Sequence, residues 1–310
     1  MARPKFGVIY SRLHPVIAPD AFGREVEAMG YDSVWATDGP VNELPALDPI
    51  VAIAGLALGT TRIAVGSCVI LSPLRNPVIL AKEAASLDVL SGGRLVLGIG
   101  VGGSSLSSPH AFRAVGVAVG ERGARCDEGI EIMTKLWSGE HVSHAGRFHR
   151  FEDVRMTPVP LQRPHPPIWA GGDAEGVLRR VARACDGFVP IGSGAESYRA
   201  HAERIATLAR GHGREPAAIT RAVHLYFCLA RDRGEGRAIA ERVLSERYGY
   251  PVRLAEDDRF ALGSAEDCLE TITAYRAAGV EHFIINTVRP LEDVVGEVRH
   301  FAERVLPRVH

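Results

Sequence analysis

The chain has 310 residues, of which 46% are hydrophobic and 24% are charged, and its formal net charge is −1. This composition, without low-complexity tracts, is that of a globular protein with enough apolar material for a large core. Basic and acidic residues are interleaved, so the sequence lacks the sustained basic patch that nucleic acid or an anionic membrane surface requires. We therefore expect neither as a partner.

The five cysteines are an odd number and include no C-x-x-C pair. We expect them to be reduced core residues rather than disulfides or zinc ligands, and we expect no metal site. Met1 is followed closely by the strand-like segment 5–10, which leaves no room for a signal peptide, and no apolar run approaches membrane-spanning length. These features predict a soluble, cytoplasmic protein.

In chain order, short apolar strand-like segments alternate with segments of helical periodicity. The strand-like segments are 5–10, 33–38, 62–71, 94–100, 167–171, 187–191, 220–230 and 281–287. The helical segments are 18–29, 47–58, 76–90, 121–137, 173–184, 195–211, 233–247, 264–278 and 291–306. Most strands are apolar on both faces, as covered parallel strands are. The alternation predicts a parallel sheet closed into a (β/α)8 TIM barrel, in a single domain over residues 1–310.

Two stretches are longer than a minimal barrel needs. Residues 138–165, after the fourth strand, contain a hairpin-like run, and residues 249–263 join two helices that follow the seventh strand. We expect both to be insertions within the barrel. An open doubly wound sheet is the alternative fold, but it requires a convincing dinucleotide fingerprint, which is missing.

Glycines gather at three of the predicted strand exits, where barrel enzymes carry their functional residues. The fourth strand ends in a glycine-rich run, 98–103, which matches a dinucleotide loop only weakly; a tight exit without a ligand is the alternative. The fifth strand ends in Gly171-Gly172, and the sixth in Gly192-Ser193-Gly194, each just before a helix. Backbone N–H groups converge at helix N-termini, so these two exits predict a shared phosphate pocket.

The run 61–103 resembles the signature of the luciferase-like, flavin- and deazaflavin-dependent oxidoreductases. Stretches 121–137, 163–172 and 263–285 match in order and spacing, so the resemblance covers essentially the whole chain. It implies a barrel, usually a homodimer, that binds the deazaflavin coenzyme F420 or reduced FMN in its mouth and acts on a small organic molecule. The richness in Ala, Arg and Gly favours F420.

The resemblance also implies positions for the cofactor. The bond Cys68–Val69 matches a non-prolyl cis peptide behind the cofactor ring, and Asp38 matches an aspartate that lines the pocket. Val101 and Gly102 match a pair beside the ring, and Gly171-Gly172 matches a pair that contacts phosphate.

One further position near the expected ring is open to two readings. Ser72, with Arg75, either hydrogen-bonds a ring carbonyl or the substrate, or braces its own loop.

The usual proton-transfer residues of one branch are absent. The sugar-phosphate dehydrogenases have a histidine after the aspartate and a glutamate after the fourth-strand pair, where this chain has Gly39 and Gly103. His14, after the first strand, and His110, after the fourth, are the candidates for a general acid or base, because the pKa of histidine is close to neutrality. A solvated loop histidine is the alternative for each.

Three functions remain open at this stage. The first is hydride transfer between F420 and an organic substrate, and the second is oxygenation by reduced FMN, supplied by a separate reductase. The third is a barrel that binds the cofactor without catalysis.

Other prominent residues have structural interpretations. Trp35, Trp137 and Trp169 are expected in the core, and Arg94 in a salt-bridge network at the bottom of the barrel.

Overall fold

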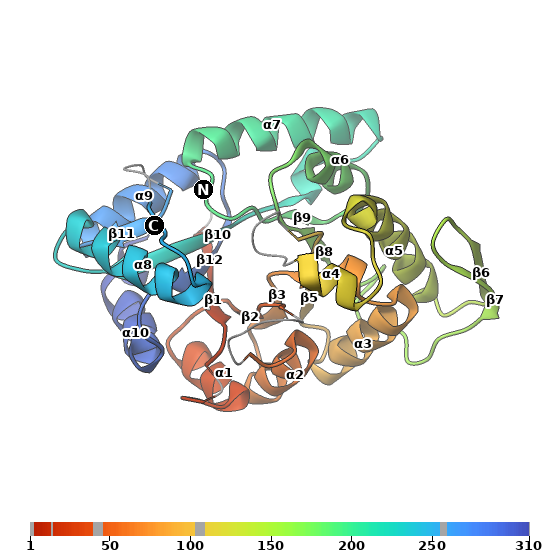
Figure 1. The fold of residues 1–310 in the computed structure, drawn as a ribbon, viewed down its shortest axis with the longest axis horizontal. Helices are drawn as coiled ribbons and strands as arrows, with labels where there is room; N and C mark the ends of the chain where they lie inside the picture. Colours follow the sequence, from red (N-terminus) through yellow and green to blue (C-terminus); the bar gives the residue numbers. More distant parts are fainter. Residues whose placement is uncertain (1–2, 14, 40–45, 103–108, 255–258, 310) are drawn as a thin grey trace.

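The structure is a computed structural model, and it describes residues 3–13, 15–39, 46–102, 109–254 and 259–309. Eight parallel strand positions form a closed barrel, as predicted (Figure 1). The barrel strands are β1 (Lys5–Tyr10), β2 (Ser33–Ala36), β3 (Ala64–Ser67) with its continuation β4 (Ile70–Leu71), β5 (Leu95–Gly100), β8 (Ile168–Ala170), β9 (Gly187–Phe188), β10 (Thr220–Leu229) and β12 (His282–Thr287). The pairings β9–β10 and β12–β1 close the ring.

Helices surround the barrel between successive strands (Figure 1). They are α1 (Pro19–Ala28), α2 (Pro49–Gly59), α3 (Pro77–Leu90), α5 (Arg122–Leu136), α6 (Glu175–Ala184), α7 (Ala195–Gly211), α9 (Ala265–Ala277) and α10 (Val294–Arg304). Local signals set several of these boundaries. Asn76 caps α3 through its side chain, and Ser264 and Asp267 form the predicted capping box of α9.

Both predicted insertions are present, after the fourth and seventh barrel strands. The first, 138–165, contains an antiparallel hairpin of β6 (Val142–Ala145) and β7 (Arg150–Val154), which follows α5. The short helix α4 (Pro109–Ala114) lies earlier in the same connection between β5 and β8. The second, 249–263, follows the predicted helix α8 (Arg233–Tyr248) and ends in β11 (Ala261–Gly263), a strand that the sequence did not predict. β11 pairs with the C-terminal end of β10, and α8 packs on both, so this insertion lies at the C-terminal end of the barrel.

Two predicted strands are shorter or interrupted. The expected strand 62–71 is divided into β3 and β4 by the cis peptide bond Cys68–Val69, which the resemblance had implied. The expected strand 187–191 is reduced to β9, and Ile191 forms only an isolated bridge with His224.

Two tryptophans fill the inside of the barrel, as expected of core residues. The rings of Trp35 and Trp169 lie 5.1 Å apart, and glycines on neighbouring strands leave room for them. A β-carbon at Gly66 would lie 2.7 Å from the Trp35 ring. The indole N–H of Trp35 donates to Ser33 Oγ, which also lies 2.7 Å from Nε2 of the buried His282. The polar groups of this layer are therefore paired with one another.

The expected salt-bridge network around Arg94 is wrong. Arg94 donates to the carbonyls of Ala57, Thr60, Ile63 and Ser91 and to the hydroxyl of Thr60, and within the described residues no carboxylate forms an ion pair with it. Its guanidinium satisfies backbone carbonyls where α2 ends and β3 begins, which is the same stabilising role with different acceptors.

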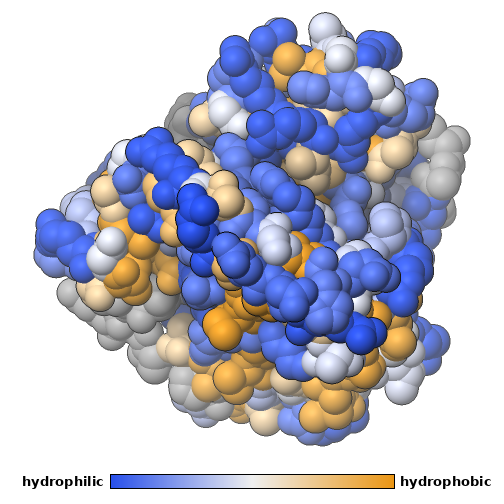
Figure 2. Space-filling view, turned by 90° about the vertical axis from the view of Figure 1, so that its right-hand side faces the viewer, coloured by the Kyte–Doolittle hydropathy of each residue, from blue (hydrophilic) through white to orange (hydrophobic). Residues whose placement is uncertain are grey.

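The molecular surface has one apolar region that the barrel itself does not require. Figure 2 shows hydrophobic residues gathered on the lower part of one face, where α2 and α3 lie. Val51 and Leu58 of α2 and Ile79 of α3 are 59%, 69% and 57% exposed. None of the helices that the structure describes is long and apolar enough to cross a membrane.

Candidate functional site

The third-strand exit packs against the exits of β5 and β8. Val69, directly after the cis bond, fills the space that side chains at three glycines would occupy: a β-carbon at Gly100 would lie 2.5 Å, at Gly171 2.9 Å and at Gly98 3.4 Å from its methyl groups. Packing against Val69 therefore requires glycine at positions 100 and 171. We call this group, Val69 with Gly98, Gly100 and Gly171, the Val69 platform.

Asp38 braces the segment that follows the platform. Its carboxylate accepts the N–H of Leu71 (3.0 Å) and a hydrogen bond from Arg75 (3.2 Å), and its side chain is only 1% exposed. Arg75 also reaches Asp48 (2.7 Å), the N-cap of α2. Asp38 therefore lies at the barrel mouth, but its oxygens are already engaged in holding β4.

Ser72 lies next to this brace. It is buried, and its hydroxyl donates to Cys126 Sγ at 3.2 Å, towards α5. Its geometry corresponds to the loop-bracing alternative. All five cysteines are buried and unpaired, as expected, and burial raises the pKa of the Cys68 thiol to about 12.

The remaining mouth residues are placed as follows. Val101 and Gly102 follow β5 directly and are half-buried, and Gly102 has a φ of 76°. His110 is exposed at the start of α4. His14 and Gly103 lie outside the described residues.

The predicted phosphate pocket has fewer free backbone N–H groups than the sequence indicates, because several of them donate to groups of the chain itself. The N–H of Gly171 donates to Ile99 O, that of Gly192 to His224 O, and that of Gly194 to the Tyr275 hydroxyl. A β-carbon at Gly192 would lie 2.6 Å from Arg259 O, so chain packing explains this glycine.

Groups at these exits without a partner among the described residues include the N–H of Gly172 and the buried Oγ of Ser193. Both can bind an anion oxygen, and the Val69 platform beside them offers an apolar surface for a flat ring. These residues thus fit the ring and phosphate of a flavin-type cofactor, and Ser193, which the sequence named only as part of the sixth-strand exit, joins the candidate contacts.

The inward faces of β10 and β12 carry a second polar group, of which the sequence does not reveal every member. His224 and Asn286 are buried, with Nε2 and Nδ2 3.1 Å apart. Arg247 of α8 donates to Thr287 O (3.4 Å), at the end of β12. Burial, and then the Arg247 charge, lower the pKa of His224 to about 4, so this histidine is neutral near pH 7. We call Arg247, His224 and Asn286 the β10–β12 polar group.

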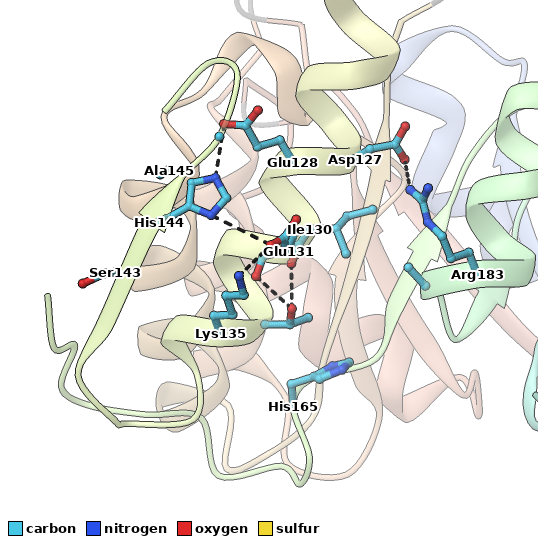
Figure 3. Close-up of a pocket in the computed structure, with 13 residues that line it drawn as sticks. Asp127, Glu128, Ile130, Glu131, Lys135, Ser143, His144, Ala145, His165 and Arg183 are labelled. Atoms are coloured by element: carbon cyan, nitrogen blue, oxygen red, sulfur yellow. Dashed lines mark hydrogen bonds and ion pairs between the residues drawn. The ribbon is translucent and has the colours of Figure 1, made fainter. Parts of the chain in front are cut away.

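A large open pocket lies away from the mouth, between α5, the β6–β7 hairpin and α6 (Figure 3). It has a volume of about 870 Å³. Its charged groups are paired with one another: Lys135 with Glu131, Arg183 with Asp127, and Glu128 with the hairpin N–H groups and His144. Glu128 joins the hairpin to α5, Arg183 joins α6 to α5, and the pair Lys135–Glu131 lies within α5, so these contacts stabilise the packing of the three elements.

The sequence profile of the luciferase-like monooxygenase family matches residues 20–305. The chain belongs to this family.

Curated relatives with a stated activity include a monooxygenase and a reductase. An uncharacterized protein of Mycobacterium tuberculosis is 38% identical over 145 residues, but the match covers only 47% of this chain and 48% of the relative, about half of each. The FMNH2-dependent dimethylsulfone monooxygenase of Pseudomonas putida is 28% identical over 76% of this chain and 71% of its own. The 5,10-methylenetetrahydromethanopterin reductase of Methanolobus tindarius is 26% identical over 77% and 70%.

Among solved structures, the monooxygenase RslO1 of Streptomyces bottropensis superposes with a TM-score of 0.82 and 25% identity. It covers 99% of this chain and all of its own (100%).

Proposed function

We propose that this enzyme transfers a hydride between coenzyme F420 and a small organic substrate. The observation that carries the proposal is the Val69 platform, an apolar surface at the exits of three neighbouring strands whose one side chain is that of Val69. Beside it lie the N–H of Gly172 and the hydroxyl of Ser193, which have no partner among the described residues. The likeness to the methylenetetrahydromethanopterin reductase supports a reductase reaction rather than oxygenation. Bound there, the deazaflavin would supply the hydride-carrying carbon.

The protein's own contribution under this proposal is binding and orientation. The platform supports one face of a flat ring, and Asp38 fixes the platform by holding Leu71 and Arg75. The N–H of Gly172 and the hydroxyl of Ser193 bind the phosphate of the cofactor. Because Gly39 and Gly103 stand where the sugar-phosphate branch has its acid and base, the substrate belongs to another class. Among the candidates for proton transfer, His110 lies at the mouth side of the barrel, and His14 stays a candidate from sequence.

An FMNH2-dependent monooxygenase is the second candidate. It is favoured by the likeness to the dimethylsulfone monooxygenase and to RslO1. This alternative requires oxygen and a separate reductase that delivers reduced FMN. A cofactor-binding barrel without catalysis is the remaining candidate from another class.

We also propose that the chain forms a homodimer through α2 and α3. Val51, Leu58 and Ile79 are large apolar residues exposed on adjacent helices, and a monomer in water has no reason to expose them together. A second copy of the same face provides the matching apolar surface in a two-fold dimer.

Stopped-flow oxidation of the reduced cofactor–enzyme complex tests the reaction class. The proposal predicts slow oxidation by dissolved oxygen and fast oxidation by a carbonyl substrate from a panel. Fast consumption of oxygen coupled to substrate hydroxylation supports the monooxygenase instead. If neither oxygen nor any carbonyl substrate oxidises the reduced cofactor, the result supports the barrel that binds the cofactor without catalysis.

A further inference from the structure

Arg247 carries a positive charge at the barrel mouth, near the end of β12. Its Nη2 donates to Thr287 O at 3.4 Å, which is a long hydrogen bond, and its Nε is buried with no acceptor. Within the part of the chain that the structure describes, no carboxylate forms an ion pair with it. A buried donor without an acceptor is costly, so Nε of Arg247 has the capacity to bind an acceptor beyond the described residues, such as a ligand.

The other arginines at strand ends are held by carboxylates. Arg75 binds Asp38 and Asp48, and Arg289 lies 3.4 Å from Glu297 and also donates to Leu229 O. These two arginines are used to stabilise the loops at the mouth. Arg247 stands in a comparable position, at the end of β12, but it has only the carbonyl of Thr287.

Arg247 lies next to two inward-facing polar side chains. His224 and Asn286 pair with each other across β10 and β12, where Tyr226 is in register with Asn286. His224 is close enough to the guanidinium for the Arg247 charge to lower its pKa. A neutral imidazole and an amide add hydrogen-bonding groups without adding charge, so the net charge of the group is that of Arg247.

The group stands across the barrel from the proposed ring surface. The Val69 platform belongs to the exits of β3, β5 and β8, while the polar group belongs to β10, β12 and α8, which follow later around the ring (Figure 1). A molecule held between the two would have one end on the cofactor ring and the other on Arg247.

We propose that Arg247, assisted by His224 and Asn286, binds the carboxylate of an organic acid substrate. This inference rests on the proposed function, because it places the carboxylate opposite the ring surface. A guanidinium offers two parallel N–H donors, here Nε and one Nη, and this fork matches the two oxygens of a carboxylate. The substrate class is therefore a carboxylic acid that carries its reacting group at a distance from the acid.

The test uses the cofactor-loaded enzyme and two matched probes, 4-fluorobenzoate and 4-fluorobenzamide, followed by fluorine NMR. The expected result is that the carboxylate binds at least about ten-fold more tightly than the amide, since the two have nearly the same shape and differ in charge. R247Q should remove this preference, and R247K should keep part of it, because lysine retains the charge but lacks the fork. R242Q is the matched control, on the same helix, at a 56% exposed arginine paired with Glu246.

Cofactor affinity is measured in the same samples, so that failure of the carboxylate proposal can be distinguished from failure of the cofactor proposal. Loss of the carboxylate preference in R247Q, with cofactor affinity unchanged and R242Q like the parent, supports the subsite. Equal binding of the two probes, or a preference that survives in R247Q, overturns it while leaving the cofactor proposal standing. Competition between 4-fluorobenzoate and the cofactor also overturns it, because Arg247 would then hold part of the cofactor. A parent protein that binds no cofactor overturns the proposed function instead.

Discussion

Val69 occupies the space that a side chain at position 171 would need: a β-carbon on Gly171 would lie 2.9 Å from Val69 Cγ1. This contact joins the exit of the third barrel strand to that of the fifth, and it explains why glycine stands at a position that the sequence alone assigned to a phosphate. The same residue can serve both purposes, since a strand exit without a side chain leaves its neighbouring backbone open to a ligand.

Gly171→Ala is expected to push Val69 out of its position. The overpacking should lower the free energy of unfolding by about 1–3 kcal/mol and weaken cofactor binding, as measured by denaturant unfolding and by titration. The double variant V69A/G171A should recover most of the loss, since the contact is then relieved. G176A, in α6 with open space around it, is the control, and it should be neutral or slightly stabilising. Equal losses in G171A and the double variant would refute the packing explanation.

Asp38→Asn should destabilise the fold by about 1–3 kcal/mol, because Arg75 loses a buried charged acceptor while the Leu71 N–H keeps an oxygen. Asp48→Asn, at a side chain that is 43% exposed, removes the other carboxylate of Arg75 and should cost less than about 1 kcal/mol. Urea unfolding of both variants checks the difference. A similar effect of the two substitutions would mean that Asp38 does not brace β4.

Stability should fall as the pH drops from 6.5 towards 4.5. Burial lowers the pKa of His282 to about 3 and, together with the Arg247 charge, that of His224 to about 4. Both histidines therefore take up protons in the unfolded chain, at pKa values near 6.5, before they do so in the folded one, and protonation favours unfolding. Each contributes a slope of up to about 1.4 kcal/mol per pH unit.

His282→Gln should flatten the pH profile between 6.5 and 4.5, because one of the two groups is removed. The exposed His300→Gln serves as the control and should leave the slope unchanged. Unfolding free energies at four pH values are sufficient. An unchanged slope in H282Q would show that this histidine is not the source of the effect.

Leu58→Glu should convert the proposed dimer into a monomer, since it places a charge at the most exposed large apolar residue of α2. Sedimentation velocity at micromolar concentration measures the change. Thr207→Glu introduces the same charge on α7, on the far side of the barrel (Figure 1), and should leave the assembly as it is. A parent protein that is already monomeric contradicts the dimer proposal.

The fold could be predicted from the sequence because a barrel repeats one local pattern. Each strand is short and apolar, and each helix carries its own start and stop signals, such as Asn76 and the Ser264–Asp267 box. β11 was missed because three residues, Ala261–Gly263, carry too little periodicity to be distinguished from a loop.

The site could be predicted only where the resemblance supplied positions. The sequence placed Asp38 at the mouth, but it could not show that Arg75 and Leu71 occupy its oxygens, since those contacts depend on how β2 and β4 meet. It also gave no sign that Arg247, near the end of a mixed-charge helix, differs from Arg242. That difference comes from the packing of α8 on β10 and β11, which brings Arg247 to the end of β12.

Titration of the purified apo-protein with F420 and, separately, with FMN tests the central proposal most directly. We expect saturable binding of F420, which the G171A and Ser193→Ala substitutions weaken. We expect FMN to bind at least about ten-fold more weakly than F420, a difference of about 1.4 kcal/mol in binding free energy. Tight binding of FMN with none of F420 would contradict it.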